Sequence, residues 1–267
     1  MADVVRRSVP CGVCKLGVSL LHREVQQGSS FYEIRKKFVS LCVSFKIQTE
    51  PVCTGFFDVF GPEVLPALNV TKLGTSDICR MVLGESCDGT KTHIENWSID
   101  LPEKRRPGQP VFKILQISDP HLDPDYVAGS PANCEEPLCC REYSTPNSSK
   151  PTIPAGRWGT YGKCDAPSIL LENMLEHIVL EHPDIDYVIW TGDLPPHDIW
   201  NQTKESNLAI IKHTVEQMLA YFPNTAVFPA VGNHESVPAG RPINRWMPRR
   251  IRSSCSSLVR GNQRVKS

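Results

Sequence analysis

The chain has 267 residues, which is enough for two domains of ordinary size, each with its own hydrophobic core. Hydrophobic residues make up 40% and charged residues 22% of it, a balance typical of globular proteins rather than disordered ones. The formal net charge is zero, so composition indicates no general affinity for nucleic acids. The chain has no run of about 18 apolar residues, so the sequence predicts no transmembrane helix.

The first 90 residues have the pattern of a small helical bundle. Ser30 and Glu33 form a capping box, which predicts a helix through Phe38 and Phe45. Apolar residues at helical spacing predict an earlier helix over 13–21 and a later one over 56–65, and a short fourth helix opens near 75–77. We expect the third segment to be broken near Pro62 and Pro66, because proline removes a helical hydrogen bond.

Eleven cysteines indicate an oxidising compartment, and the first six lie in this bundle. Six cysteines allow fifteen pairings, so their spacing alone does not fix the connectivity. A zinc site that uses Cys11 and Cys14 is an alternative, but no second pair of cysteines or histidines follows at the spacing of a zinc finger. Four glycosylation sequons agree with a secreted chain, at Asn69, Asn96, Asn147 and Asn201.

Composition also suggests the domain boundaries. Residues 92–110 are rich in proline and basic side chains, which predicts a stiff linker between residues 7–91 and residues 111–240. Residues 1–10 lack the apolar core of a secretory signal, so we expect the natural start to lie upstream or the chain to be partial. Residues 241–267 are basic and contain the unmatched Cys255, which we interpret as a divergent tail. A tail that binds nucleic acid is the alternative, but aromatic residues are not interleaved with its basic ones.

From residue 111 the pattern alternates between strands and helices. We predict strands over 111–117, 187–190 and 226–231, and helices over 167–182 and 208–222. This order predicts a parallel αβ core, whose ligands bind beyond the carboxyl ends of the strands.

Polar motifs follow each predicted strand. Asp119 and His121 follow the first strand, Asp193 the second, and Asn233 and His234 the third. A single Asp-x-His is more often a turn than a metal site. Together, however, these motifs bring carboxylates, imidazoles and an amide to one edge of a sheet. Such groups are typical ligands of divalent cations.

These motifs resemble the calcineurin-like metallophosphoesterase pattern D-x-H, G-D, G-N-H-E. The resemblance implies that Asp119 and His121 bind a first metal, that Asp193 bridges two metals, and that Asn233 binds the second. It also implies that His234 protonates the leaving alkoxide, a role suited to a group that titrates near neutral pH.

The cysteines of the bundle resemble those of saposin B-type domains. That resemblance implies the pairs Cys11–Cys87, Cys14–Cys79 and Cys42–Cys53. The clustered phenylalanines fit two interpretations, a closed core or an apolar face that opens towards lipid.

The two parts together resemble the acid sphingomyelinase family, which implies disulfides in the long loop between Cys134 and Cys139 and between Cys140 and Cys164. His197 matches a histidine beside the substrate phosphate in that family; an ordinary loop histidine is the alternative. The implied fold class is an α+β two-domain protein, an all-α saposin-like disulfide bundle followed by an incomplete α/β metallophosphoesterase domain. The implied activity is zinc-dependent hydrolysis of sphingomyelin to ceramide and phosphocholine by a lysosomal or extracellular glycoprotein, which we expect to be a monomer.

One departure from the family pattern concerns the metal site. Family members supply three more metal-binding histidines, whereas the last histidine here is His234. The second zinc would keep only Asp193 and Asn233, too few ligands for tight binding. We therefore expect weak or no activity and a sheet with an open apolar edge or face. A non-catalytic lipid-binding isoform, and a phosphoesterase acting on nucleotides, are the two alternative hypotheses.

Overall fold

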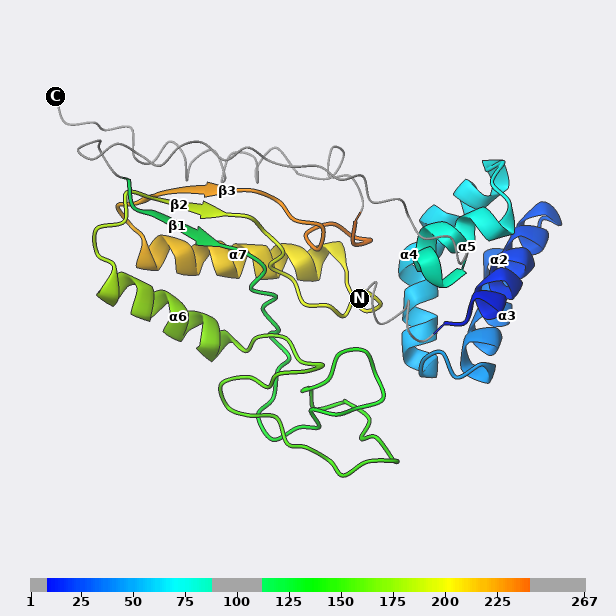
Figure 1. Ribbon diagram of the computed structural model, residues 1–267, viewed down its shortest axis with the longest axis horizontal. Helices are drawn as coiled ribbons and strands as arrows, with labels where there is room; N and C mark the ends of the chain where they lie inside the picture. Colours follow the sequence, from blue (N-terminus) through cyan, green and yellow to red (C-terminus); the bar gives the residue numbers. More distant parts are fainter. Residues whose placement is uncertain (1–8, 88–111, 241–267) are drawn as a thin grey trace.

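The N-terminal part of the computed structural model is a bundle of helices (Figure 1). The model describes residues 9–87 and 112–240. The bundle consists of α2 (Cys11–Gln26), α3 (Phe31–Ser44), α4 (Glu50–Val70) and α5 (Thr75–Leu83), followed by the short 3-10 helix η1 (Gly84–Cys87). Helix α4 packs against α2 and α3, and α5 packs against α2. The predicted linker and the tail lie outside the described residues.

The start of α3 confirms the predicted capping box. The Ser30 hydroxyl accepts a hydrogen bond from the Glu33 amide, and the Glu33 carboxylate accepts one from the Ser30 amide at 2.8 Å. Both bonds satisfy amide groups that have no partner within a helix. The local sequence therefore fixes where this helix begins.

Helix α4 corrects one expectation, because it continues through Pro62 and Pro66 without a break. An interior proline costs a helix about 3 kcal/mol or more. Packing offsets this cost: the Phe57 ring is buried and lies 5.1 Å from the Phe31 ring, measured between centroids. Gly61 permits that packing, since a Cβ there would lie 3.1 Å from the Phe31 ring. Tertiary burial thus overrides the local signal.

Five disulfides cross-link the described residues, and they are the pairs that the family resemblance implied. Three join the helices of the bundle, which has a small core of its own. Two lie in the long loop that follows the first strand. The pairs are Cys11–Cys87, Cys14–Cys79, Cys42–Cys53, Cys134–Cys139 and Cys140–Cys164.

The second part contains a parallel sheet in the order β1 (Ile114–Ile117), β2 (Tyr187–Trp190) and β3 (Ala226–Pro229). The predicted parallel αβ arrangement is confirmed. Strands β1 and β3 are shorter than expected, although residue 111 lies outside the described range. Their carboxyl ends point the same way (Figure 1).

Two helices, α6 (Ser168–Glu181) and α7 (Lys204–Tyr221), cover one face of this sheet (Figure 1). Helix α7 begins four residues earlier than predicted, because Thr203 and Ser206 form a capping box. Buried side chains from the strands and both helices form one core; they include Ile117, Leu175, Val188, Trp190, Met218 and Val227. On the opposite face Ile114 and Phe228 are about half exposed. Within the described ranges these two side chains are therefore only partly covered.

The bundle approaches the second part at Gly55. A Cβ at Gly55 would lie 2.3 Å from the carbonyl oxygen of Trp200, in the loop after β2. Only a glycine permits this approach of helix α4 to that loop. None of the helices in the two described ranges is long and apolar enough to cross a membrane.

Candidate metal centre

The carboxyl ends of the three strands bring the predicted site residues together. Beyond the strands, amides of the loop after β1 donate to carbonyls of the loop after β2: Asp119 to Gly192 at 3.1 Å, His121 to Asp193 at 3.2 Å, and Leu122 to Leu194 at 2.8 Å. The two loops therefore run side by side as an extension of the sheet.

Three of the predicted metal ligands have left-handed backbones. The angle φ is +52° at Asp119, +38° at His121 and +57° at Asp193. Residues other than glycine rarely adopt positive φ, and such strain is concentrated at functional sites. This conformation turns the three side chains towards a common point beyond the sheet edge.

Two glycines allow the loops after β2 and β3 to meet. A Cβ at Gly192 would lie 2.3 Å from the amide nitrogen of Gly232, and a Cβ at Gly232 would lie 2.2 Å from Oδ1 of Asp193. Neither distance is compatible with a side chain. The sequence motifs contain both glycines, but their close approach is visible only in the structure.

Two overlapping groups of side chains could hold a metal ion. The ligand atoms of Asp119, His121 and Asp193 all lie within 4.8 Å of one another, and so do those of His121, His197 and His234. Carboxylate oxygens and imidazole nitrogens are ligands that divalent zinc accepts. The residues present therefore fit the metal expected from the sequence.

Asn233, the remaining predicted ligand, lies beside His234 and is exposed. Its backbone carbonyl accepts hydrogen bonds from the Gly240 amide at 2.8 Å and the Ser236 hydroxyl at 3.2 Å. These bonds fold residues 233–240 into a compact turn, which keeps Asn233 next to the site.

His197 is fixed by a carboxylate that the sequence did not reveal. One carboxylate oxygen of Asp165 accepts a hydrogen bond from the backbone amide of His197 at 2.6 Å. The other oxygen lies 2.7 Å from Nδ1 of His197. Asp165 follows Cys164, whose disulfide to Cys140 anchors this segment. A carboxylate on Nδ1 sets the tautomer of an imidazole and leaves Nε2 free.

Glu235 connects the loops after β2 and β3. Its carboxylate accepts hydrogen bonds from the amides of Gly232 at 2.6 Å, Leu194 at 2.6 Å and Asp193 at 3.1 Å. Burial raises the pKa of Glu235, while the three amide donors oppose that increase. The motif contained this residue, but sequence reasoning assigned it no role.

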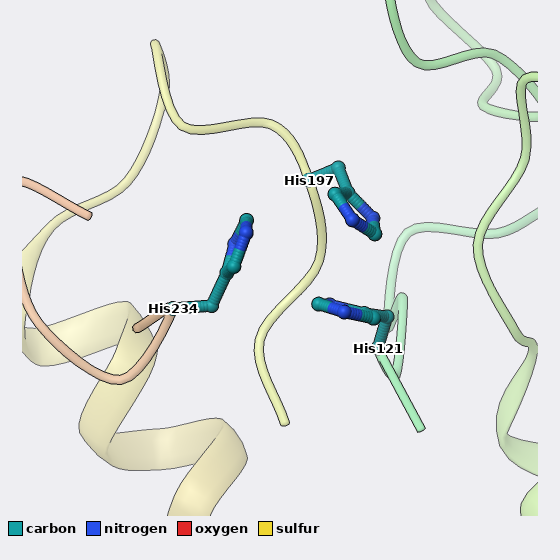
Figure 2. Close-up of side chains that lie close together, drawn as sticks. All are labelled: His121, His197 and His234. Carbon is teal, nitrogen blue, oxygen red and sulfur yellow. The ribbon is translucent and has the colours of Figure 1, made fainter. Parts of the chain in front are cut away.

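His234 is buried at the centre of the site, with 7% of its surface exposed. Its amide donates to Oδ1 of Asp193 at 2.8 Å, and its carbonyl accepts from the Asn207 side chain at 3.0 Å. Burial lowers the pKa of its imidazole, and electrostatic interaction with the neighbouring imidazoles of His197 and His121 (Figure 2) lowers it further. Its Nδ1 is buried, and a hydrogen bond between the ring and the Pro196 backbone opposes the decrease in pKa.

A buried ion triad supports the site from the side of the disulfide loop. Arg141 makes two bonds of 2.9 Å to Asp123 and one of 2.7 Å to Asp198. Asp123 follows His121 by two residues, and Asp198 follows His197 directly. Although burial opposes it, bonds to both carboxylates raise the pKa of Arg141 above its usual range. The triad thus joins three separate segments around the histidines.

Comparison with known proteins gives consistent matches. The family described as calcineurin-like phosphoesterase matches residues 112–261. Over 270 residues the chain is 33% identical to "Sphingomyelin phosphodiesterase B" of Dictyostelium discoideum, covering 96% of this chain and 41% of the relative. Over 261 residues it is 32% identical to "Sphingomyelin phosphodiesterase" of Homo sapiens, covering 94% of this chain and 40% of the relative.

A relative from Mus musculus, "Acid sphingomyelinase-like phosphodiesterase 3b", matches 53% of this chain at 33% identity. The chain spans about two fifths of the length of the sphingomyelin phosphodiesterases given above. Taken with the metal-ligand groups at the carboxyl edge of a parallel sheet, the matches identify the chain as a member of the calcineurin-like phosphoesterase family.

Proposed function

We propose that this chain represents part of a sphingomyelin phosphodiesterase, which hydrolyses sphingomyelin to ceramide and phosphocholine at a zinc site. One observation carries the proposal: ligand atoms of Asp119, His121 and Asp193 lie within 4.8 Å of one another at the carboxyl edge of the sheet. The names of the relatives supply the substrate class.

In this proposal Asp119 and His121 would hold one zinc ion, Asp193 would be shared with a second, and Asn233 would contribute to the second. Bound zinc neutralises phosphate charge and activates water. Asp193 is suited to the bridging position because it is buried and its backbone lies between the loops after β1 and β3. Asp119 is the more accessible ligand, with 58% of its side chain exposed.

The two further histidines act on the phosphodiester. His234 donates a proton to the departing alkoxide; its lowered pKa means that this proton is present mainly in acidic surroundings. His197 faces the phosphate, and Asp165 holds its ring in place through Nδ1. A histidine oriented in this way is pre-organised for an anionic substrate.

The helical bundle is the lipid-binding part in this proposal, as a saposin B-type domain. Large apolar side chains are exposed on it; among them Tyr32 is 69%, Phe45 49% and Phe31 43% exposed. Lys36 and Lys37 line a groove that also includes Phe45. Glu33 also lines this groove and Lys37 pairs with Glu24 at 2.6 Å, so the exposed apolar surface is the feature that suits a membrane. The approach of Gly55 to Trp200 brings this bundle to the loop that carries His197.

The disulfides and sequons support an oxidising location, lysosomal or extracellular. We include glycosylation of Asn69, Asn147 and Asn201, of which Asn69 and Asn201 are exposed, in the proposal. Asn96 lies outside the described residues. The protein would act as a monomer.

The described residues offer ligands for one cation more readily than for two, so we expect these 267 residues to hydrolyse sphingomyelin slowly at most. A lipid-binding protein without turnover is the second candidate, and the exposed apolar residues of the bundle favour it. A phosphoesterase acting on nucleotides is the third.

The test is a zinc titration with sphingomyelin vesicles and, separately, with a soluble phosphodiester. Zinc-dependent release of phosphocholine, abolished in Asp193→Asn but retained in the exposed control His213→Gln, supports the enzyme. Vesicle binding without any phosphocholine release supports the lipid-binding candidate. Competition by a nucleotide diester that exceeds competition by sphingomyelin supports the third.

A further inference from the structure

A small polar cavity lies between the long loop after β1, the loop after β2 and the start of helix α7. Its volume is about 80 Å³. Most of its lining residues are polar, and they include Asp125, Arg141, Asp198, Gln202 and Asn207. A cavity of this size and lining has room for an ion and a few waters rather than for an organic ligand.

Three side-chain oxygens at this cavity are buried and have no hydrogen-bond partner among the described residues. They are Oδ1 of Asp198, Oε1 of Gln202 and Oδ1 of Asn207. The three residues are 5%, 5% and 1% exposed, respectively. Buried polar atoms without partners are rare in folded proteins, because each of them has lost its bonds to water. Three such atoms around one cavity therefore indicate a common ligand.

The nitrogen ends of the two amides are already bonded. Nε2 of Gln202 donates to the Pro196 carbonyl at 2.7 Å, and Nδ2 of Asn207 donates to the His234 carbonyl at 3.0 Å. A carbonyl accepts hydrogen bonds and cannot donate them, so each amide must keep its nitrogen on that side. The oxygens are therefore the atoms left for the cavity, and their ligand must be a cation or a hydrogen-bond donor.

The charge around the cavity favours a cation. Arg141 donates to both carboxylate oxygens of Asp123 at 2.9 Å and to Oδ2 of Asp198 at 2.7 Å, which leaves Oδ1 of Asp198 available. Asp125 lines the exposed side of the cavity. Three carboxylates thus surround one guanidinium, so the formal charges leave two negative charges in excess. A divalent cation neutralises that excess, whereas water does not.

We propose that this cavity binds a calcium ion through the free oxygens of Asp198, Gln202 and Asn207, with Asp125 on its exposed side. Calcium takes six to eight oxygen ligands in flexible geometry, among them amide carbonyls and waters. Magnesium requires near-ideal octahedral geometry, and zinc favours nitrogen and sulfur ligands. Because the ligands carry little charge, we expect a dissociation constant of about 10⁻⁴–10⁻³ M, as in extracellular calcium-binding modules.

This calcium site shares no ligand with the zinc site of the proposed function, but it connects the segments that carry two of the site histidines. Asp198 directly follows His197, and Gln202 holds the carbonyl of the residue before His197. Asn207 holds the carbonyl of His234. The calcium ion is therefore a structural cation, which ties the loops after β2 and β3 to the start of α7.

The experiment uses the full chain, loaded with zinc and dialysed free of calcium, and titrates it with CaCl₂ in a calorimeter. We expect one calcium ion per chain. The unfolding midpoint should rise by about 3–6 °C at a calcium concentration ten times the dissociation constant, because calcium binds only the folded chain. Magnesium at the same concentration and ionic strength should raise the midpoint less.

Gln202→Met and Asn207→Leu each remove one ligand oxygen and should weaken calcium binding about tenfold or more. Asp125→Asn keeps the fold, because this position is exposed, and should weaken binding about 3- to 10-fold through the lost charge. The matched control is Gln217→Met in α7. Its Oε1 is also buried without a partner among the described residues, but Gln217 does not line the cavity, so calcium affinity should be unchanged. Circular dichroism of each calcium-free variant verifies its fold.

The inference is overturned if the unmodified chain binds no calcium up to about 10 mM, since ordered water then satisfies the three oxygens. It is also overturned if Gln202→Met and Asn207→Leu bind calcium like the parent chain while Asp193→Asn does not. The calcium ion would then lie at the zinc centre. Calcium binding that these two variants lose, in a chain that never releases phosphocholine, supports the inference and refutes the enzyme. The two proposals can therefore fail separately.

Discussion

Replacement of Arg141 by methionine tests whether the buried ion triad holds the segments around the site together. The Arg141 side chain is 3% exposed, that of Asp123 is 0% exposed, and that of Asp198 is 7% exposed. Methionine fills most of the arginine volume but leaves two buried carboxylates without a cation. Burial already raises the pKa of Asp123, against the bonds to Arg141 that lower it. Without Arg141 that carboxyl must bind a proton or the segment must open.

Removing one member of a buried ion group costs about 3–5 kcal/mol in unfolding free energy. For a chain of this size that corresponds to a fall of about 6–20 °C in the unfolding midpoint. Thermal unfolding followed by circular dichroism measures the change. Asp123→Asn combined with Arg141→Met should recover part of the loss, because it removes one unpaired charge.

The matched control is Arg157→Met in the same disulfide loop. Arg157 is exposed and lies over the Trp158 ring at 5.7 Å, so its loss costs about 1 kcal/mol at most. If the unfolding free energy of Arg141→Met lies within about 1 kcal/mol of that of the parent chain, the triad contributes no more to stability than a surface ion pair does. The reasoning from burial is then wrong.

Three further outcomes are expected. Gly192→Ala should destabilise the chain by about 2–5 kcal/mol in chemical unfolding, because it adds a backbone clash to the strain of φ +87°. The control Gly129→Ala, at φ +90° in open space, should cost only about 1–2 kcal/mol. Equal losses of stability in the two variants would contradict the clash. The pKa of His234 is lowered in the folded chain, so protons favour the unfolded state below the unfolded value of about 6.5. The metal-free chain should therefore lose stability as the pH falls from about 7.5 to 5, and His234→Gln should lose less. Identical pH profiles of the two chains would refute the assignment of this pH dependence to His234. Gly12→Ala should stabilise its helix by about 0.5–1 kcal/mol, whereas Gly55→Ala should add no stability, because its Cβ would clash with Trp200. Gly55→Ala should also reduce the hydrolysis of sphingomyelin vesicles more than that of a soluble diester. Equal effects on the two substrates would show that the bundle and the site act independently.

Much of the fold follows from short-range patterns in the sequence. The Ser30–Glu33 box determines where α3 begins, and the apolar run Tyr187–Trp190 is β2 with the predicted bounds. Parallel pairing follows from the alternation of strands and helices. The same alternation brings Asp119, His121 and Asp193 to one sheet edge. These signals are readable because capping and hydrophobic periodicity act over a few neighbouring residues.

Local signals failed where tertiary packing dominates. Pro62 and Pro66 predicted a break, yet burial of Phe57 carries α4 through both. The start of α7 was also misjudged, but there the missed signal is local, because the Thr203–Ser206 capping box precedes the first apolar residue. Hydrophobic periodicity reports neither the packing of Phe57 nor this cap.

The sequence by itself determined the types of candidate metal ligand and the strands that they follow. Only the tertiary structure decided which groups hold those side chains: Asp165 lies 32 positions before His197, and Arg141 lies 57 positions before Asp198. Chain folding alone makes such distant pairs neighbours, and no spacing rule relates them. The same long-range convergence assembles three histidines into one cluster, because each belongs to a different loop.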